Sequence, residues 1–157
     1  MYIIEGFVSG IVATIMFDIF QYTLYYSYNI NRSRWDLVGR YFIGFKNKIY
    51  IRENLENDDP IKNELIIGYL IHYLIGSIFG LIYVLINTIF FNEPSIFLAI
   101  FVGFATVIGG WCIMMPYAYN IGFFAIKKDE WKQILAQNLL VHFIFGIGLF
   151  IGYIIVN

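Results

Sequence analysis

The chain has few of the residues that build a soluble domain or a nucleic-acid surface. Only 13% of its 157 residues are charged, and its ten basic and eleven acidic side chains leave a formal net charge of -1. It has no basic patch interleaved with aromatics, so we expect no nucleic-acid partner. Soluble chains of this length keep a large polar surface. The scarcity of charge therefore indicates that something other than water covers much of this protein.

Cysteine and proline are also scarce. Cys112 is the single cysteine, and it lies inside an apolar run, so this chain alone forms neither a disulfide framework nor a cysteine-based zinc site. We interpret Cys112 as a small buried apolar residue. The chain has three prolines and no Gly/Ser/Pro-rich linker, which favours a single membrane domain over residues 1–157.

Long apolar runs are what the chain has in abundance, since 60% of its residues are hydrophobic and 20% are aromatic. A membrane-spanning helix needs roughly 20 consecutive apolar residues. The first run lacks a positively charged start and a small-residue cleavage site, so we interpret it as a retained helix and not as a signal peptide. The sequence predicts an all-α polytopic membrane protein whose four transmembrane helices form two hairpins. Their expected bounds are about 3–30, 65–91, 96–126 and 134–156.

The one long polar stretch, residues 31–64, is expected to be a cytoplasmic loop with some structure of its own. Its apolar residues recur at helical spacing over residues 33–45, which predicts a short amphipathic helix lying on the membrane surface. Ser33 and Asp36 resemble a capping box at the start of that helix. The candidate functional residues of this loop are Trp35, Gly39 and Arg40.

The basic residues predict the orientation in the membrane. Seven lie in the first loop, three lie in residues 127–132, and the 92–95 turn and both termini have none. Loops rich in Lys and Arg stay in the cytoplasm. We therefore predict a multi-pass protein of the cell (inner) membrane, with both termini on the extracytoplasmic side.

Each predicted spanning helix contains an exceptional residue near the membrane midplane or on its cytoplasmic side. A charged Asp at the centre of a helix costs about 2.5–3.5 kcal/mol on insertion scales, so such residues face protein or water. Pro116 predicts a kink in the third helix. The residues expected to form an intramembrane polar cluster are Asp18, His72, Asn138 and His142.

The sequence leaves three interpretations of this cluster open. It can bind a small ligand or relay protons, since His and Asp inside a membrane often do so. It can instead hold the helices together through hydrogen bonds in a structural or accessory subunit. A more distant alternative is an intramembrane metalloenzyme, with metal held by Asp18, His72 and His142, although no spacing signature supports it.

Neither Ser77 nor Cys112 lies in a nucleophile motif, so we expect no catalytic residues and lean against an enzyme. The sequence predicts no metal and no cofactor. The expected partners are the lipid bilayer and, for transport, further copies of the chain, because four helices enclose little volume. The ligand itself is not identified.

A family resemblance follows from motifs spread over nearly the whole chain. They are Trp35 with Gly39 and Arg40, Glu64 before Gly68, His72 with Tyr73 and Gly76, Met115 with Pro116, and His142 with Phe145, Gly146, Ile147, Gly148 and Leu149. The chain resembles the family called domain of unknown function 2938. The resemblance implies a small four-helix bacterial membrane protein without an assigned activity. It also implies that Asp18, Arg40, His72, Pro116 and His142 are motif positions.

Overall fold

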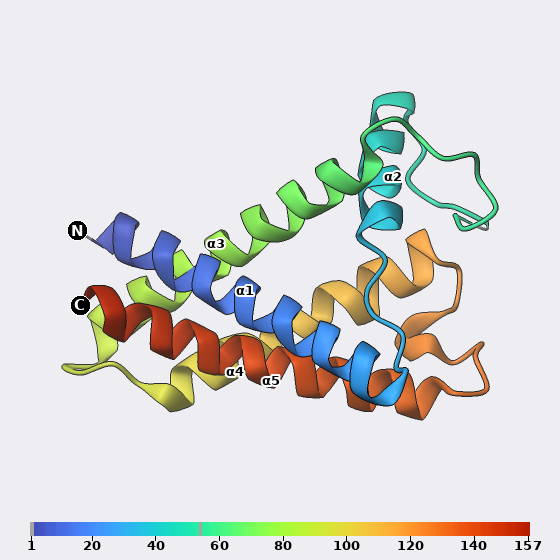
Figure 1. Ribbon diagram of the computed structural model, residues 1–157. Coiled ribbons are helices and arrows are strands. Elements are labelled where there is room, and N and C mark those ends of the chain that lie inside the picture. Colours follow the sequence, from blue (N-terminus) through green and yellow to red (C-terminus); the bar gives the residue numbers. More distant parts are fainter. Residues whose placement is uncertain (1, 54) are drawn as a thin grey trace. The chain divides into compact units, whose positions relative to one another are not determined.

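The computed structural model describes residues 2–53 and 55–157, and every regular element in them is helical (Figure 1). The five α-helices are α1 (Tyr2–Tyr28), α2 (Trp35–Gly44), α3 (Glu64–Phe90), α4 (Ile96–Gly109) and α5 (Trp131–Val156). A π-helix, η2 (Gly110–Ala118), continues α4 directly, and two short 3₁₀ turns are η1 (Phe45–Asn47) and η3 (Phe123–Ala125).

Four helices in the described part of the chain are long and apolar enough to cross a membrane: Tyr2–Tyr28, Glu64–Phe90, Ile96–Ala118 and Trp131–Val156. Large apolar side chains are exposed on all of them, among them Ile3, Leu70, Phe97 and Ile155. Such a surface is compatible with lipid and not with water. The predicted all-α fold with four membrane-length helices and a short helix in the first loop is confirmed.

The third helix is shorter than predicted: it ends at Ala118 and not near residue 126. Pro116 lies in η2 and has no backbone N–H to donate. Beyond it, the Tyr119 N–H donates to the carbonyl of Met114, five residues back, at 3.0 Å. Asn120 and Gly122 then adopt positive φ values of 53° and 80°, which are incompatible with a continuing right-handed helix.

The capping box predicted at the start of α2 is wrong. Ser33 is instead hydrogen-bonded to the Gln21 side chain. The Gln21 Nε2 donates to Ser33 Oγ at 2.8 Å, and the Gln21 Oε1 accepts from Ser33 N at 2.7 Å. Asp36 pairs with Arg34. The α2 helix therefore begins at Trp35 with no side-chain cap.

The tertiary contacts group the chain into two compact units. Unit 1 comprises Met1–Ser33, Tyr73–Thr106 and Leu139–Asn157, and unit 2 comprises Arg34–His72 and Val107–Asn138. The single membrane domain predicted over residues 1–157 stays a prediction.

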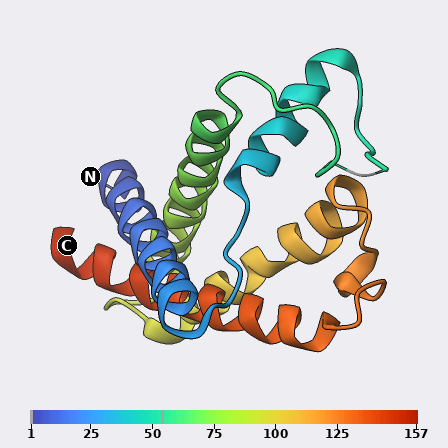
Figure 2. The ribbon, with the colours of Figure 1, turned by 45° about the vertical axis from the view of Figure 1, so that its right-hand side comes forward.

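In unit 1, α1 packs antiparallel against both α3 and α5 (Figures 1 and 2). A Cβ added at Gly10 of α1 would lie 2.5 Å from the Cα of Ser77 on α3. One added at Gly148 of α5 would lie 2.5 Å from the Cα of Ala13 on α1. Small residues at these crossings let the backbones approach closely, which is how membrane helices gain packing energy without a hydrophobic drive.

Unit 2 contains a small core formed beneath the first loop. Its fully buried members come from three separate segments, and Leu55 is only 1% exposed. The Arg52 N–H donates to the Tyr117 carbonyl at 2.9 Å, and the Tyr41 hydroxyl donates to the Tyr50 carbonyl at 2.8 Å. The loop between α2 and α3 is therefore folded against the end of η2. The core consists of Leu37, Tyr41, Leu55 and Ala118, with Phe42, Met114 and Tyr119 packed against it.

Candidate functional site

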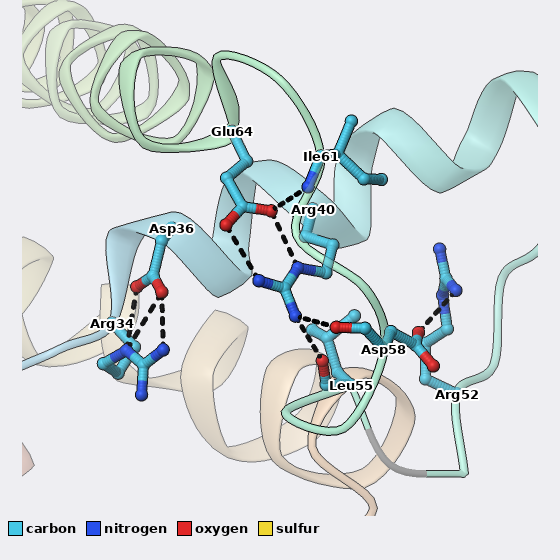
Figure 3. A network of polar contacts seen from close by, with 8 residues as sticks. All are labelled: Arg34, Asp36, Arg40, Arg52, Leu55, Asp58, Ile61 and Glu64. Atoms are coloured by element: carbon cyan, nitrogen blue, oxygen red, sulfur yellow. Dashed lines mark hydrogen bonds and ion pairs between the residues drawn. The ribbon is translucent and has the colours of Figure 1, made fainter.

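The guanidinium of Arg40 is the centre of a polar network in unit 2 (Figure 3). It makes a bidentate pair with Glu64, from Nε to Oε2 and from Nη2 to Oε1, both at 2.8 Å. Nη1 donates to the carbonyls of Leu55 at 3.0 Å and Asp58 at 2.6 Å. Four of its five N–H donors therefore have acceptors, which satisfies a side chain that is only 4% exposed.

Glu64 is held equally firmly, since it is 13% exposed and its Oε2 also accepts from the Ile61 N–H at 2.8 Å. The hydrogen bonds from Arg40 to Glu64 raise the pKa of the Arg40 guanidinium above its ordinary value, against the opposing effect of burial. Arg40 therefore keeps its charge, and the pair ties α2 to the first turn of α3.

Two glycines bring α2 and α3 into backbone contact. A Cβ added at Gly39 would overlap the carbonyl oxygen of Glu64, and a Cβ added at Gly68 would overlap the carbonyl oxygen of Trp35. Those obstacles are backbone atoms, which cannot rotate away as a flexible side chain can. This crossing therefore requires glycine on both helices.

One turn before Gly39 on α2 and one turn after Gly68 on α3, the rings of Trp35 and His72 are stacked, with centroids 3.8 Å apart and planes inclined by 20°. Tyr69 lies beside the same indole, with its ring centroid 6.2 Å away. We call the contact made by Trp35, Gly39 and Arg40 of α2 with Glu64, Gly68 and His72 of α3 the α2–α3 junction. Of the predicted loop residues, Trp35 contacts the predicted cluster residue His72, while Gly39 and Arg40 contact Glu64 within unit 2.

Two of the four predicted cluster residues lie in unit 1, and each has a polar neighbour on another helix. Asp18 of α1 is hydrogen-bonded to the Tyr73 side chain of α3. His142 of α5 has its Nδ1 2.5 Å from the Thr106 hydroxyl of α4. The edge of the His142 ring also contacts Phe17, at a centroid distance of 5.3 Å.

Thr106 links His142 to the backbone of α4. Its hydroxyl lies 2.6 Å from the carbonyl oxygen of Gly103 and hydrogen-bonds with Nδ1 of His142. This contact ties α5 to α4.

The other two predicted residues lie in unit 2. The Asn138 amide donates to the carbonyl of Ile134 one turn earlier at 2.9 Å, and its Oδ1 lies on the side of Gly110. Pro116 lies in η2, near its end. Among the residues that the structure describes, no three His, Cys, Asp or Glu side chains lie together in a way that could hold a metal ion.

Four residues at these sites were absent from the sequence-based site prediction. Glu64 was noted only as a family motif position at the start of an apolar run, and no local pattern links it to Arg40, 24 residues earlier. Leu55 lies in a stretch that reads as acidic and turn-rich. Tyr73 was noted only as a family motif position beside His72, and Thr106 carries no sequence signal that separates it from the other threonines of the helices.

These features define the class of the protein: a helical membrane protein with four helices of membrane-spanning length and an ordered first loop. The chain belongs to the family described as "Protein of unknown function (DUF2938)", whose sequence model matches residues 7–156. The family resemblance noted in the sequence is thereby confirmed. Comparison with curated proteins and with solved structures finds no match.

Proposed function

We propose that this membrane protein binds protons or a small ligand through polar side chains inside its spanning helices, with Asp18, His72, Asn138 and His142 as the binding residues. The observation that supports the proposal best is that both ionisable cluster residues of unit 1 have polar partners on other helices. Glycine contacts already hold those helices together, so packing alone does not require a carboxyl and an imidazole there.

Proton binding suits these groups better than a large ligand does. An imidazole can bind and release a proton through its ring nitrogens. A carboxyl beside a tyrosine hydroxyl can exchange a proton with water that reaches it. Four helices enclose little volume, so we further propose that transport involves a homo-oligomer.

Purified protein in liposomes tests this function directly. With a pH gradient and a pH-sensitive dye inside the vesicles, we expect the wild type to conduct protons above the level of empty liposomes. Asp18→Asn and His142→Ala should each reduce that flux at least tenfold while leaving helix content unchanged. Asp129→Asn, which makes the same chemical change at an exposed position, should conduct as the wild type does. Wild-type flux equal to that of empty liposomes would reject proton translocation.

The second candidate is a structural or accessory membrane subunit, and the stack of His72 on Trp35 favours it. In that case His72 serves as a flat packing surface at the α2–α3 junction. His72→Phe then preserves the protein, because phenylalanine retains a ring but has no nitrogen to titrate. Loss of proton flux in His72→Phe with unchanged thermal stability would favour the first candidate instead.

We further propose that the protein lies in the cell (inner) membrane with both termini extracytoplasmic, on the strength of the ten basic residues in its first and third loops. A reporter that is active only in the cytoplasm should give no signal when fused after Asn157. The same reporter inserted at residue 128, in the third loop, should be active. The reverse pattern would overturn this orientation.

A further inference from the structure

The turn that follows α2 exposes large apolar side chains beside lysines. We call residues 45–51 of unit 2, which read FKNKIYI, the lysine turn. Tyr50 and Ile51 are 55% and 69% exposed, and Lys46 and Lys48 are exposed just before them. A contiguous apolar surface of this kind on a loop marks an interaction site, because water does not favour it.

The lysine turn has a defined conformation. Its Lys48 adopts a positive φ of 58°, and the Lys48 N–H donates to the Phe45 carbonyl at 3.0 Å. The Ile49 N–H donates to the Gly44 carbonyl at 3.2 Å. The rings of Phe45 and Tyr50 contact each other, with centroids 5.3 Å apart. The backbone and these rings therefore fix where the exposed side chains lie.

The lysine turn is attached to the end of a membrane-length helix. Residues 119–130 join two helices of membrane-spanning length, α4 with η2 and α5, so this connection lies at one surface of the bilayer. The Arg52 N–H, directly after the lysine turn, donates to the Tyr117 carbonyl at 2.9 Å. The Asn120 amide donates to the Glu53 carbonyl at 3.0 Å. These bonds hold the lysine turn at the level where hydrocarbon meets headgroups.

The same connection repeats the combination of exposed apolar side chains and lysines. Residues 123–128 read FFAIKK, and both of their lysines are exposed. Phe123 is exposed too, and its ring contacts that of Tyr117 at 6.1 Å. The lysine turn and this segment together have four lysines and no acidic residue, and the nearest acids in the sequence, Glu53 and Asp129, lie just outside them. The partner of this surface should therefore be apolar and negatively charged.

We propose that the lysine turn is a binding site for anionic phospholipids. Tyr50 and Ile51 enter the edge of the hydrocarbon layer, and Lys46 and Lys48 bind the phosphate groups of the lipids. Aromatic rings and lysines are the side chains that suit this boundary, because each has an apolar part and a polar end. A second copy of this chain fits the surface less well, since a symmetric contact would place lysines against lysines. The inference goes beyond the proposed function, because no residue of the intramembrane polar cluster takes part.

Site-specific photocrosslinking tests what the lysine turn contacts. Tyr50→benzoylphenylalanine keeps an aromatic side chain there, and the protein is reconstituted in vesicles of equal parts phosphatidylglycerol and phosphatidylcholine. After illumination, mass spectrometry should find lipid adducts at residue 50. We expect phosphatidylglycerol to exceed phosphatidylcholine by at least about fivefold, which corresponds to about 1 kcal/mol for one lysine near an anionic surface. Adding Lys46→Gln and Lys48→Gln should make the two adducts nearly equal.

Phe97→benzoylphenylalanine is the matched control. Phe97 is exposed on α4, which has a membrane-spanning length with η2 and contains no basic residue. It should give both lipid adducts in equal amounts. An adduct with protein at residue 50, or no adduct there while residue 97 gives one, would refute the insertion of the lysine turn. Equal adducts of the two lipids at residue 50, or a preference that survives the loss of both lysines, would refute headgroup binding by Lys46 and Lys48.

Discussion

Replacing Arg40 by leucine should destabilise the α2–α3 junction by about 3–5 kcal/mol, the cost of removing one partner of a buried ion pair. Leucine leaves the Glu64 carboxylate without its bidentate donor and leaves the carbonyls of Leu55 and Asp58 without theirs. The transmembrane helices should stay inserted, because their apolar length is unchanged. The expected result is a junction that opens and exposes the loop between α2 and α3.

Limited proteolysis of that loop, together with the thermal midpoint in detergent, measures the effect. Arg34→Leu is the matched control, since Arg34 also pairs with a carboxylate, Asp36, but its side chain is 56% exposed. An exposed pair contributes about 0–1 kcal/mol, so the control should behave nearly as the wild type does. Equal proteolysis of Arg40→Leu and Arg34→Leu would contradict a structural role for the buried pair. The double variant Arg40→Leu, Glu64→Leu should recover part of the loss, because no unpaired carboxylate is left.

A single methyl group at Gly68 should have the second largest effect. A Cβ at this position overlaps the carbonyl of Trp35, so Gly68→Ala forces α2 and α3 apart. Overpacking of this kind costs about 1–3 kcal/mol, and the Trp35–His72 stack should weaken with it. The thermal midpoint should fall, and the environment of Trp35 should change in its fluorescence.

Gly109→Ala is the matched control, because the same chemical change should not lower stability there. A Cβ added at Gly109 meets nothing within 4 Å, and the residue has helical φ and ψ of -59° and -43°. Alanine there should be neutral or stabilising by up to about 1 kcal/mol, because it restricts the unfolded chain more than glycine does. If both alanines lower the midpoint equally, close contact between α2 and α3 is not what requires glycine at residue 68.

The Arg40→Leu and Gly68→Ala variants test the role of the family motif residues at the α2–α3 junction. Six of the residues through which the chain resembles its family are the members of the α2–α3 junction, namely Trp35, Gly39, Arg40, Glu64, Gly68 and His72. They form an ion pair, a backbone contact and a ring stack at successive points of one helix crossing. In this chain these six motif residues hold α2 against α3, while Asp18 and His142 remain the candidates for proton or ligand binding.

Some features of the site could be predicted from sequence and some could not, for identifiable reasons. Helical spacing correctly predicted α2, but it did not show which groups Arg40 contacts. In the structure both faces of α2 are covered, and Arg40 is as buried as Tyr41. The ion pair with Glu64 offsets the cost of burying the Arg40 charge. Glu64 is 24 residues away in the sequence, so no local pattern links it to Arg40.

The sequence by itself determined that the chain is helical and has four segments of membrane-spanning length. The thickness of the hydrocarbon layer sets how long an apolar run must be, and each run satisfies its backbone hydrogen bonds internally, so length and composition suffice. Only the tertiary structure decided where the third helix stops, how the first loop folds over Leu55, and which donor meets each buried acid. Those outcomes depend on contacts between residues far apart in the chain. The same contacts surround Glu64 with hydrogen-bond donors.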